Sequence, residues 1–334
     1  MQEITMDLQL AESYIAKGIF DGAVVLAGTE KEDTLRQAIG IADRVSGRKM
    51  ALDTVFDVSS VTKPVCTATC ALLLAERGLL DLDAPFTEYL PDFHGKLLAP
   101  VSIRALAAHY TGIEQDYPVN APADELLKHI FNSPAVMLPW KEFSYSCACY
   151  DMLGFIVERI SGMPMAQFAK EHLFKPLGMD DSCWGYPSEN QVPRLFVHKR
   201  CVDSDRRVVF DMWARKFQPR AMGNAGLFTT AGDLAKYARM LIRRGAGLFK
   251  SDIVEREMFR NFAPEGKKPR SFGWSLDEAM RPRSFSPQFV YHSGSSGQSF
   301  WVDYGEGKFI IILTNLFGEH DEAIQARLAM ANSI

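Results

Sequence analysis

Short runs of mostly apolar residues near both ends of the chain predict strands. Near the N-terminus, a helical pattern over residues 8–15 precedes two strand-like segments at 23–28 and 35–41. Near the C-terminus, the predicted strands are 272–276, 289–292, 299–303 and 309–314, followed by a helix over 321–330. The run Tyr304-Gly305-Glu306-Gly307 predicts a hairpin turn between the last two strands.

The middle of the chain has helical rather than strand periodicity. A long apolar helix is expected after Ser60, ending at Arg77-Gly78, where glycine suits the C-cap. Further helices are expected over 149–160, over a segment opened by Pro164, and over 234–242. This pattern predicts an α+β fold with one antiparallel sheet built from both termini. We therefore expect a discontinuous sheet domain, residues 1–78 plus 221–334, and a mainly helical domain, residues 79–220.

Composition excludes several functional classes. The 334 residues are 47% hydrophobic and 23% charged, with a net charge of −4, so nothing favours a nucleic-acid partner. No apolar stretch approaches the ~20 residues of a membrane helix, and the first residues do not form a secretory signal. The six cysteines match no common zinc spacing, and no cofactor motif is evident. We expect a cytoplasmic protein with reduced thiols, no metal and no cofactor.

The segment Ser60-Val61-Thr62-Lys63 is the strongest candidate for chemistry. A serine and a lysine three residues apart on a helix share one face, so the amine can activate the hydroxyl. Strand-like residues 54–58 precede Ser60 and an apolar helix follows it. A helix N-terminus also favours a developing negative charge.

A serine three residues before a lysine occurs by chance about once in a chain of this composition. The neighbouring sequence must therefore show whether a given match is functional. Ser46-Gly47-Arg48-Lys49 is such a second match, and it lies in a polar turn. Ser60 is accompanied by three further segments. They are Phe143-Ser144-Tyr145-Ser146-Cys147, the run from Gly223-Asn224-Ala225-Gly226 to Leu234, and His292-Ser293-Gly294-Ser295.

In this order the segments resemble the class C β-lactamase-related family of serine hydrolases. That family includes class C β-lactamases, penicillin-binding proteins, D-amino-acid peptidases and β-lactamase-fold esterases. Supporting similarities lie at residues 76–83, 103–113 and 175–179, and the resemblance covers roughly residues 20–320. It implies a serine β-lactamase/DD-peptidase-like fold, with helices flanking the antiparallel sheet and Ser60 at the junction with the helical region.

The resemblance also implies roles for individual residues. Ser60 would be the nucleophile that forms an acyl-enzyme, and Lys63 and Tyr145 would be the proton-transfer pair. The backbone N–H groups of Ser60 and Ser295 would form the oxyanion hole. The segment His292-Ser293-Gly294 stands where β-lactamases have Lys-Thr-Gly, and with Cys147 it would contact the substrate.

Two positions depart from the family pattern. Cys147 replaces an asparagine that contacts the acylamino group of β-lactams, and a thiol is a weak hydrogen-bonding group. His292 replaces a lysine and removes a permanent charge, so substrate carboxylates would be bound less firmly at neutral pH. Both changes favour esters or neutral amides over β-lactams.

Simpler interpretations stand beside these. Ser60 could be a helix cap, and Tyr145 a packed loop aromatic. His292 could be a buried strand histidine with a satisfied hydrogen bond. We expect structural roles for His109, which would hold a loop, and for Asp211. Core positions are expected for Cys66 and Cys70.

The sequence thus predicts a serine hydrolase that acts through an acyl-enzyme on small esters or amides, esterase-like rather than an efficient β-lactamase. The alternatives are a penicillin-binding or sensor-like protein that is acylated without turnover, a non-catalytic binding protein, and acyl transfer to an acceptor other than water. The expected partner is a small ester, amide or β-lactam, with no nucleic acid and no membrane. The oligomeric state stays open. An α/β-hydrolase is disfavoured because Gly-x-Ser-x-Gly is missing, and a metallohydrolase because His-Glu-x-x-His is missing.

Overall fold

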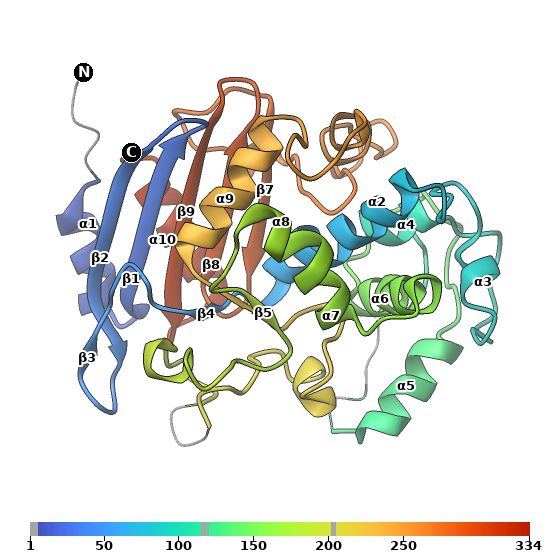
Figure 1. Ribbon diagram of the computed structural model, residues 1–334, viewed down its shortest axis with the longest axis horizontal. Helices are drawn as coiled ribbons and strands as arrows, with labels where there is room; N and C mark the ends of the chain where they lie inside the picture. The colour runs from blue at the N-terminus through green and yellow to red at the C-terminus, as the bar shows by residue number, and fades with distance from the viewer. Residues whose placement is uncertain (1–5, 115–117, 119, 202–204) are drawn as a thin grey trace.

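A computed structural model describes residues 6–114, 118, 120–201 and 205–334. Its main sheet has six strands in the order β3-β2-β1-β9-β8-β7, and all neighbouring strands are antiparallel. Their bounds are β1 Phe20–Thr29, β2 Asp33–Asp43, β3 Arg48–Lys49, β7 Phe289–Gly294, β8 Gln298–Asp303 and β9 Lys308–Leu316. Strands from both ends of the chain therefore meet in one sheet, as predicted (Figure 1).

The centre of this sheet is buried on both faces. In β1, Val24 and Leu26 belong to one hydrophobic core, whereas Ala23, Val25 and Ala27 belong to a second core on the opposite face. The apolar run of β9 alternates in the same way. Its continuous hydrophobicity thus reflects burial on two sides.

Helices cover the two faces of the sheet. Helix α9 (Ala231–Ile242) packs against β1, β8 and β9 on one face, and α1 (Leu8–Ala16) and α10 (His320–Ala331) cover the other (Figure 1). Thr230 caps α9 by accepting a hydrogen bond from the Asp233 backbone N–H at 3.2 Å. These three helices lie where the periodicity of the sequence predicts helices.

The remaining helices lie beside the sheet rather than on its faces (Figure 1). They are α2 Thr69–Glu76, α3 Phe86–Tyr89, α4 Ile103–Ala108, α5 Ala123–Asn132, α6 Cys147–Ser161, α7 Met165–Ala169 and α8 Lys175–Leu177. Helix α6 packs against α2 and α4. It begins at a Ser146 cap and ends at Gly162, whose φ of +67° suits glycine. Pro164 is the N-cap of α7, so this helix begins at Met165, one position after the expected start. No helix in the described ranges has both the length and the apolar character needed to traverse a bilayer.

The helix after Ser60 is not α-helical from its start. A 3₁₀ turn over Ser59–Val61 leads into a π-helical stretch over Lys63–Ala68, and only then does α2 begin. Pro64 has no N–H and cannot form the regular i→i−4 bond, which favours irregular geometry at this point. The predicted end is confirmed, because Gly78 has a φ of +71°.

Residues 272–276 do not form the strand that the sequence predicts. They form a tight turn in which Ser271 N–H donates to the Trp274 carbonyl at 3.0 Å, and only Ser275 bridges to β7, at Tyr291. Gly273 has a φ of +98°, which interrupts an extended strand. A Cβ at Gly273 would lie 3.1 Å from Pro64 Cα and Ala68 Cβ, so this turn packs directly on the Ser60 helix.

A second, three-stranded sheet joins segments far apart in the sequence. Its order is β4 (Phe56–Asp57), β6 (Leu227–Thr229) and β5 (Cys183–Trp184). Strand β4 leads into Ser60, and β6 belongs to the motif that begins at Gly223. This sheet therefore brings two of the predicted motifs together.

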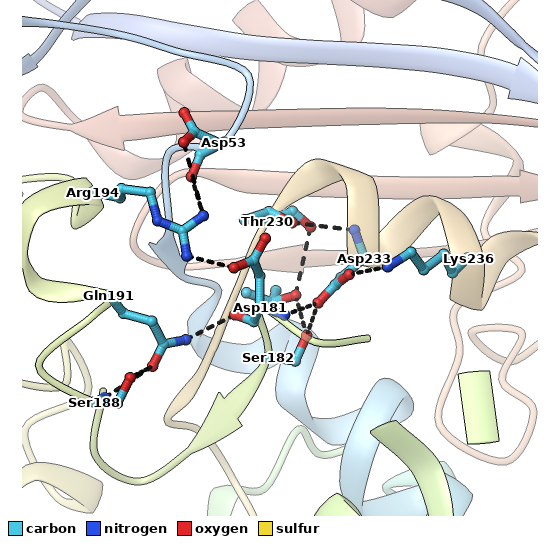
Figure 2. Close-up of polar contacts among 10 residues, drawn as sticks. Asp53, Asp181, Ser182, Ser188, Gln191, Arg194, Thr230, Asp233 and Lys236 are labelled. Atoms are coloured by element: carbon cyan, nitrogen blue, oxygen red, sulfur yellow. Dashed lines mark hydrogen bonds and ion pairs between the residues drawn. The ribbon is translucent and has the colours of Figure 1, made fainter. Parts of the chain in front are cut away.

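A buried carboxylate ties β5 to helix α9 (Figure 2). Asp233 accepts hydrogen bonds from Ser182 Oγ at 2.8 Å, from the Asp181 N–H at 2.9 Å and from Lys236 Nζ at 2.8 Å. Arg194 pairs with the Asp181 side chain beside it. The segment Thr230–Asp233 thus has a structural role, and it does not line the cavity next to Ser60.

Candidate active site

Three motifs meet around one cavity of about 380 Å³ between the sheet and the helical region. The cavity is lined by Ser60, Phe143, Tyr145, Lys268, Arg270, Ser275, Asp277, Met280, Tyr291, His292, Ser293, Ser295, His320 and Ile324. Lys63 lies beneath it and contacts Ser60. Of the predicted substrate-binding residues, Cys147 and Gly294 are not among the lining residues. Their predicted roles are untested.

The turn that carries Ser60 is strained and is held by a buried carboxyl group. Ser59 has a φ of +46°, which is unusual for a residue with a side chain. Asp57 accepts a hydrogen bond from Ser59 N–H at 2.8 Å and another from Phe210 N–H at 2.6 Å. Burial raises the pKa of Asp57 to about 6 despite these bonds. Asp57 therefore stabilises the backbone that presents Ser60.

Lys63 is buried directly behind Ser60. Its Nζ donates to Ser60 Oγ at 3.1 Å and to the Asn224 carbonyl at 2.8 Å. Burial acts to lower the pKa of Lys63, but Cys147 and Tyr145, as potential anions, raise it, and the net direction is upward. The ammonium is thus the resting form of Lys63 at neutral pH.

The segment from Gly223 to Leu227 is held against the Ser60 helix by hydrogen bonds. Thr67 Oγ1 donates to the Gly223 carbonyl at 2.5 Å, and Leu227 N–H donates to Thr62 Oγ1 at 3.0 Å. The Asn224 N–H donates to Asp151 Oδ1 at 3.0 Å, which leaves the Asn224 carbonyl directed at Lys63. The motif therefore positions the amine through its backbone.

The carboxyl group of Asp151 gives the site a pH-dependent contribution to stability. Burial, followed by the nearby Asp211 carboxylate, raises its pKa to about 8, far above the ordinary 3.8. Between these two pH values the folded protein holds a proton that the unfolded chain has lost, so stability must fall as pH rises.

We expect Asp151→Asn to remove this dependence, because the amide mimics the protonated acid. Urea unfolding between pH 5.5 and 7.5 should show the wild type losing about 1 kcal/mol per pH unit relative to the variant. Contributions from other titrating groups, Asp57 among them, cancel in this comparison. Parallel pH dependences of wild type and variant would contradict the assignment.

Tyr145 lies at the mouth of the cavity with its ring supported from behind. The centre of its ring is 4.4 Å from that of His109 and 5.0 Å from Lys63 Nζ. His109 Nδ1 accepts a hydrogen bond from the Ser146 N–H at 3.0 Å. Burial, with Arg270 and Lys63 nearby, lowers the pKa of His109 well below its usual value, so the ring is neutral. The structure therefore agrees with the prediction that His109 holds the loop.

His292 faces the cavity as a neutral side chain. Burial, then Arg270 and Lys63, lower its pKa well below the ordinary value. Its Nδ1 lies 2.9 Å from the Ser293 carbonyl, and its Nε2 is buried without a hydrogen-bond partner among the described residues. The hydrogen bond expected of a buried strand histidine is thus formed at one nitrogen, while the other is free for a ligand.

The two predicted oxyanion donors are close to each other. Ser60 is the second residue of a short helix, where N–H groups lack helical partners, and Ser295 directly follows β7. A 2.7 Å contact between Ser59 Oγ and Ser295 Oγ joins the two segments. Gly294 allows this approach, because a Cβ there would lie 2.4 Å from the Val58 carbonyl oxygen. The oxyanion hole itself stays a prediction.

Cys147 is the first residue of α6 and lies near Lys63. Burial raises the pKa of its thiol, although Lys63 acts in the opposite direction. The expected core positions of Cys66 and Cys70 are confirmed, since both are fully buried. Asp211 has the expected structural contacts, because its Oδ1 accepts the N–H groups of Trp213 and Ala214.

Sequence reasoning missed three residues of the site: Asp57, Asp151 and Arg270. Asp57 precedes Ser60 by three residues and Asp151 lies one helical turn after Cys147, so spacing alone could have suggested both. Arg270 belongs to the basic run Lys267-Lys268-Pro269-Arg270, which by itself is typical of a solvated loop. Only the tertiary fold brings it into the cavity.

The comparison with protein families agrees with this geometry. The profile of the Beta-lactamase family matches residues 9–333, almost the whole chain. The protein therefore belongs to the Beta-lactamase family, as the ordered motifs predict.

Particular relatives include esterases and peptidases. Esterase EstB of Burkholderia gladioli is 29% identical over 88% of this chain and 86% of its own length. A putative D-alanyl-D-alanine carboxypeptidase of Escherichia coli strain K12 is 25% identical over 84% of this chain and 75% of its own length. Among solved structures, EstCE1, a hydrolase with promiscuous acyltransferase activity, has a TM-score of 0.80 at 21% identity, covering 98% of this chain and 97% of that one. A class C β-lactamase has a TM-score of 0.79 at 18% identity, covering 97% and 93%. The solved structures confirm the fold.

Proposed function

We propose that this protein is a serine hydrolase that cleaves small esters through an acyl-enzyme on Ser60. The observation that carries the proposal is the 3.1 Å hydrogen bond from buried Lys63 Nζ to Ser60 Oγ, with Tyr145 on the wall of the same cavity. Both arrangements suit a hydroxyl that must lose its proton as it attacks a carbonyl. The similarity to esterase EstB along most of both chains supports the same chemistry.

In the proposed mechanism, Ser60 Oγ attacks the ester carbonyl and its proton passes to the Lys63–Tyr145 pair. This transfer requires one member of the pair to be deprotonated, either Lys63 as the free amine or Tyr145 as the phenolate, and Lys63 Nζ lies 3.1 Å from Ser60 Oγ to take part in it. The same pair then protonates the departing alcohol, and water hydrolyses the acyl-enzyme by the reverse sequence. The N–H groups of Ser60 and Ser295 would stabilise the oxyanion, each by about 2.7–4 kcal/mol of barrier.

Esters are favoured over β-lactams by two features of the site. The thiol of Cys147 cannot offer the paired donor and acceptor of an amide to an acylamino group. His292 is neutral and has one free ring nitrogen, which suits a hydrogen bond to a neutral substrate group. An ester also has a better leaving group than a peptide amide, so it needs less assistance from the proton-transfer pair.

Covalent labelling tests this proposal directly. Intact-protein mass spectrometry after incubation with a fluorophosphonate should show one adduct on the wild type and none on Ser60→Ala. Ser46→Ala is the matched control, because Ser46 also precedes a lysine by three residues, and it should label fully. An adduct that persists on Ser60→Ala would overturn the proposal.

The same preparation separates hydrolysis from acylation without turnover. Many turnovers of a 4-nitrophenyl ester per protein molecule would support an esterase. A lasting penicillin adduct with no ester turnover would instead favour a penicillin-binding or sensor-like protein.

The cytoplasmic location expected from the sequence stays a prediction. All six cysteines have free thiols, which suits a reducing compartment.

A further inference from the structure

Arg270 is a buried cation in the wall of the candidate active site. Only 7% of the residue is exposed, and its Nε is buried without a hydrogen-bond partner. Within the described ranges, no carboxylate forms an ion pair with its guanidinium. A buried charge without an anion is costly, so its position calls for a partner that the protein itself does not supply.

The surroundings of Arg270 hold it in place without neutralising it. The Phe143 ring lies 4.5 Å from the guanidinium carbon and supports it. The groups that interact with it electrostatically are Tyr145, Tyr150, Asp277 and Tyr110, together with His109 and His292. Both histidines have lowered pKa values and are neutral.

The one acid among these groups is already engaged. Asp277 lies 3.8 Å from Lys268 Nζ, and Lys268 is a second cation on the cavity wall. The lining residues in the described ranges therefore include two permanent cations and a single carboxylate. A negatively charged group on the substrate would neutralise the second cation.

We propose that Arg270 binds a carboxylate carried by the substrate, so that the preferred substrates are small esters with a free carboxylate near the scissile carbonyl. This inference rests on the proposed ester hydrolysis at Ser60. A guanidinium binds a carboxylate through two parallel hydrogen bonds, which orients the ester as well as attracting it. Because His292 stands where the family has a lysine, the sequence predicts weak binding of substrate carboxylates. Arg270 supplies the missing positive charge from a different loop.

The test compares paired substrates that differ only in charge. The 4-nitrophenyl monoesters of adipic and pimelic acids carry a free carboxylate, and the matching carboxamides are neutral. We expect the wild type to favour the carboxylate esters in kcat/KM. Arg270→Met should reduce the ratio of carboxylate to carboxamide kcat/KM by about 10- to 100-fold, mainly through KM. Arg270→Lys should restore part of this ratio.

Lys267→Met is the matched control, because it removes a positive charge from the same loop at a residue that pairs with Glu142 outside the cavity. It should leave the ratio unchanged. If Arg270→Met lowers both kinds of ester equally, Arg270 acts on the proton-transfer pair or on the fold, and the proposal is wrong. A ratio that Arg270→Met does not change would also overturn it.

Binding without turnover separates this inference from the proposed function. Calorimetry on Ser60→Ala should show tighter binding of the carboxylate ester than of its carboxamide, and the added Arg270→Met change should abolish the difference. Equal binding of the two esters to Ser60→Ala would overturn the carboxylate site even if Ser60 is the nucleophile. The opposite outcome is also informative. If the carboxylate ester binds more tightly in a way that depends on Arg270, but Ser60 of the wild type is not labelled, then the carboxylate site is supported and the proposed hydrolase function is wrong.

Discussion

Ser60→Ala is expected to reduce ester turnover by on the order of 10⁴-fold or more, the loss typical of removing a serine nucleophile. Lys63→Met should cause a loss of similar order, because Lys63 Nζ is the group hydrogen-bonded to Ser60 Oγ. Methionine keeps the length and burial of the side chain while removing its charge. The measurement is kcat/KM for a 4-nitrophenyl ester with each variant.

The double variant provides the sharper test. If Ser60 and Lys63 act as one unit, Ser60→Ala/Lys63→Met should be no slower than Ser60→Ala alone, since the amine has no purpose without the hydroxyl. Losses that multiply would show that Lys63 acts independently of Ser60. Thermal unfolding of each variant checks that a loss of activity does not reflect a loss of fold, because Lys63 is fully buried.

The second large effect is expected from Gly223→Ala. A Cβ at this position would lie 1.9 Å from the Tyr150 carbonyl oxygen and 2.6 Å from its carbon, so the backbone of α6 or of the motif must move. We expect a loss of roughly 2–4 kcal/mol in the free energy of unfolding, as is typical of forced overpacking. Activity should fall too, because the adjacent Asn224 carbonyl would shift from Lys63 Nζ.

Gly232→Ala is the matched control for this prediction. Gly232 lies in the first turn of α9, and the nearest atom to an added Cβ is Thr230 Oγ1 at 3.8 Å. Alanine should therefore be neutral or stabilise the protein by up to about 1 kcal/mol, owing to its higher helix propensity. Urea unfolding of both variants decides the matter: similar stabilities would show that the close approach at Gly223 relaxes at little cost.

The chemistry of the cavity follows from which side chains stay charged after burial. His292 and His109 lose their charge because the cost of desolvation is not offset by a nearby anion. Arginine keeps its charge under the same conditions, because its ordinary pKa is far above neutral. Arg270, which lies outside the sequence motifs, is therefore a permanent cation on the cavity wall, together with Lys268.

The sequence by itself determined the strands at both ends, the helices with clear caps, and the order of motifs that implies the family. These features depend on local periods and on residues close together in the chain, so hydrophobic patterning and capping suffice to reveal them. Ser60 and Lys63 belong to this group, because their pairing needs only one helical turn. The failed strand at 272–276 shows the limit, since its alternation is that of a strand but Gly273 turns the backbone to pack on the Ser60 helix.

Only the tertiary structure decided what surrounds Ser60 at long range. Lys63 is positioned by the carbonyl of Asn224, which is 161 residues away, and Arg270 enters the cavity from a loop whose sequence is typical of the surface. The charge state of each group depends on its burial and on neighbours from several elements. The spacing of residues along the chain predicts neither the burial nor these neighbours. The sequence thus indicates the reaction, whereas the three-dimensional packing selects which substrates the cavity can bind.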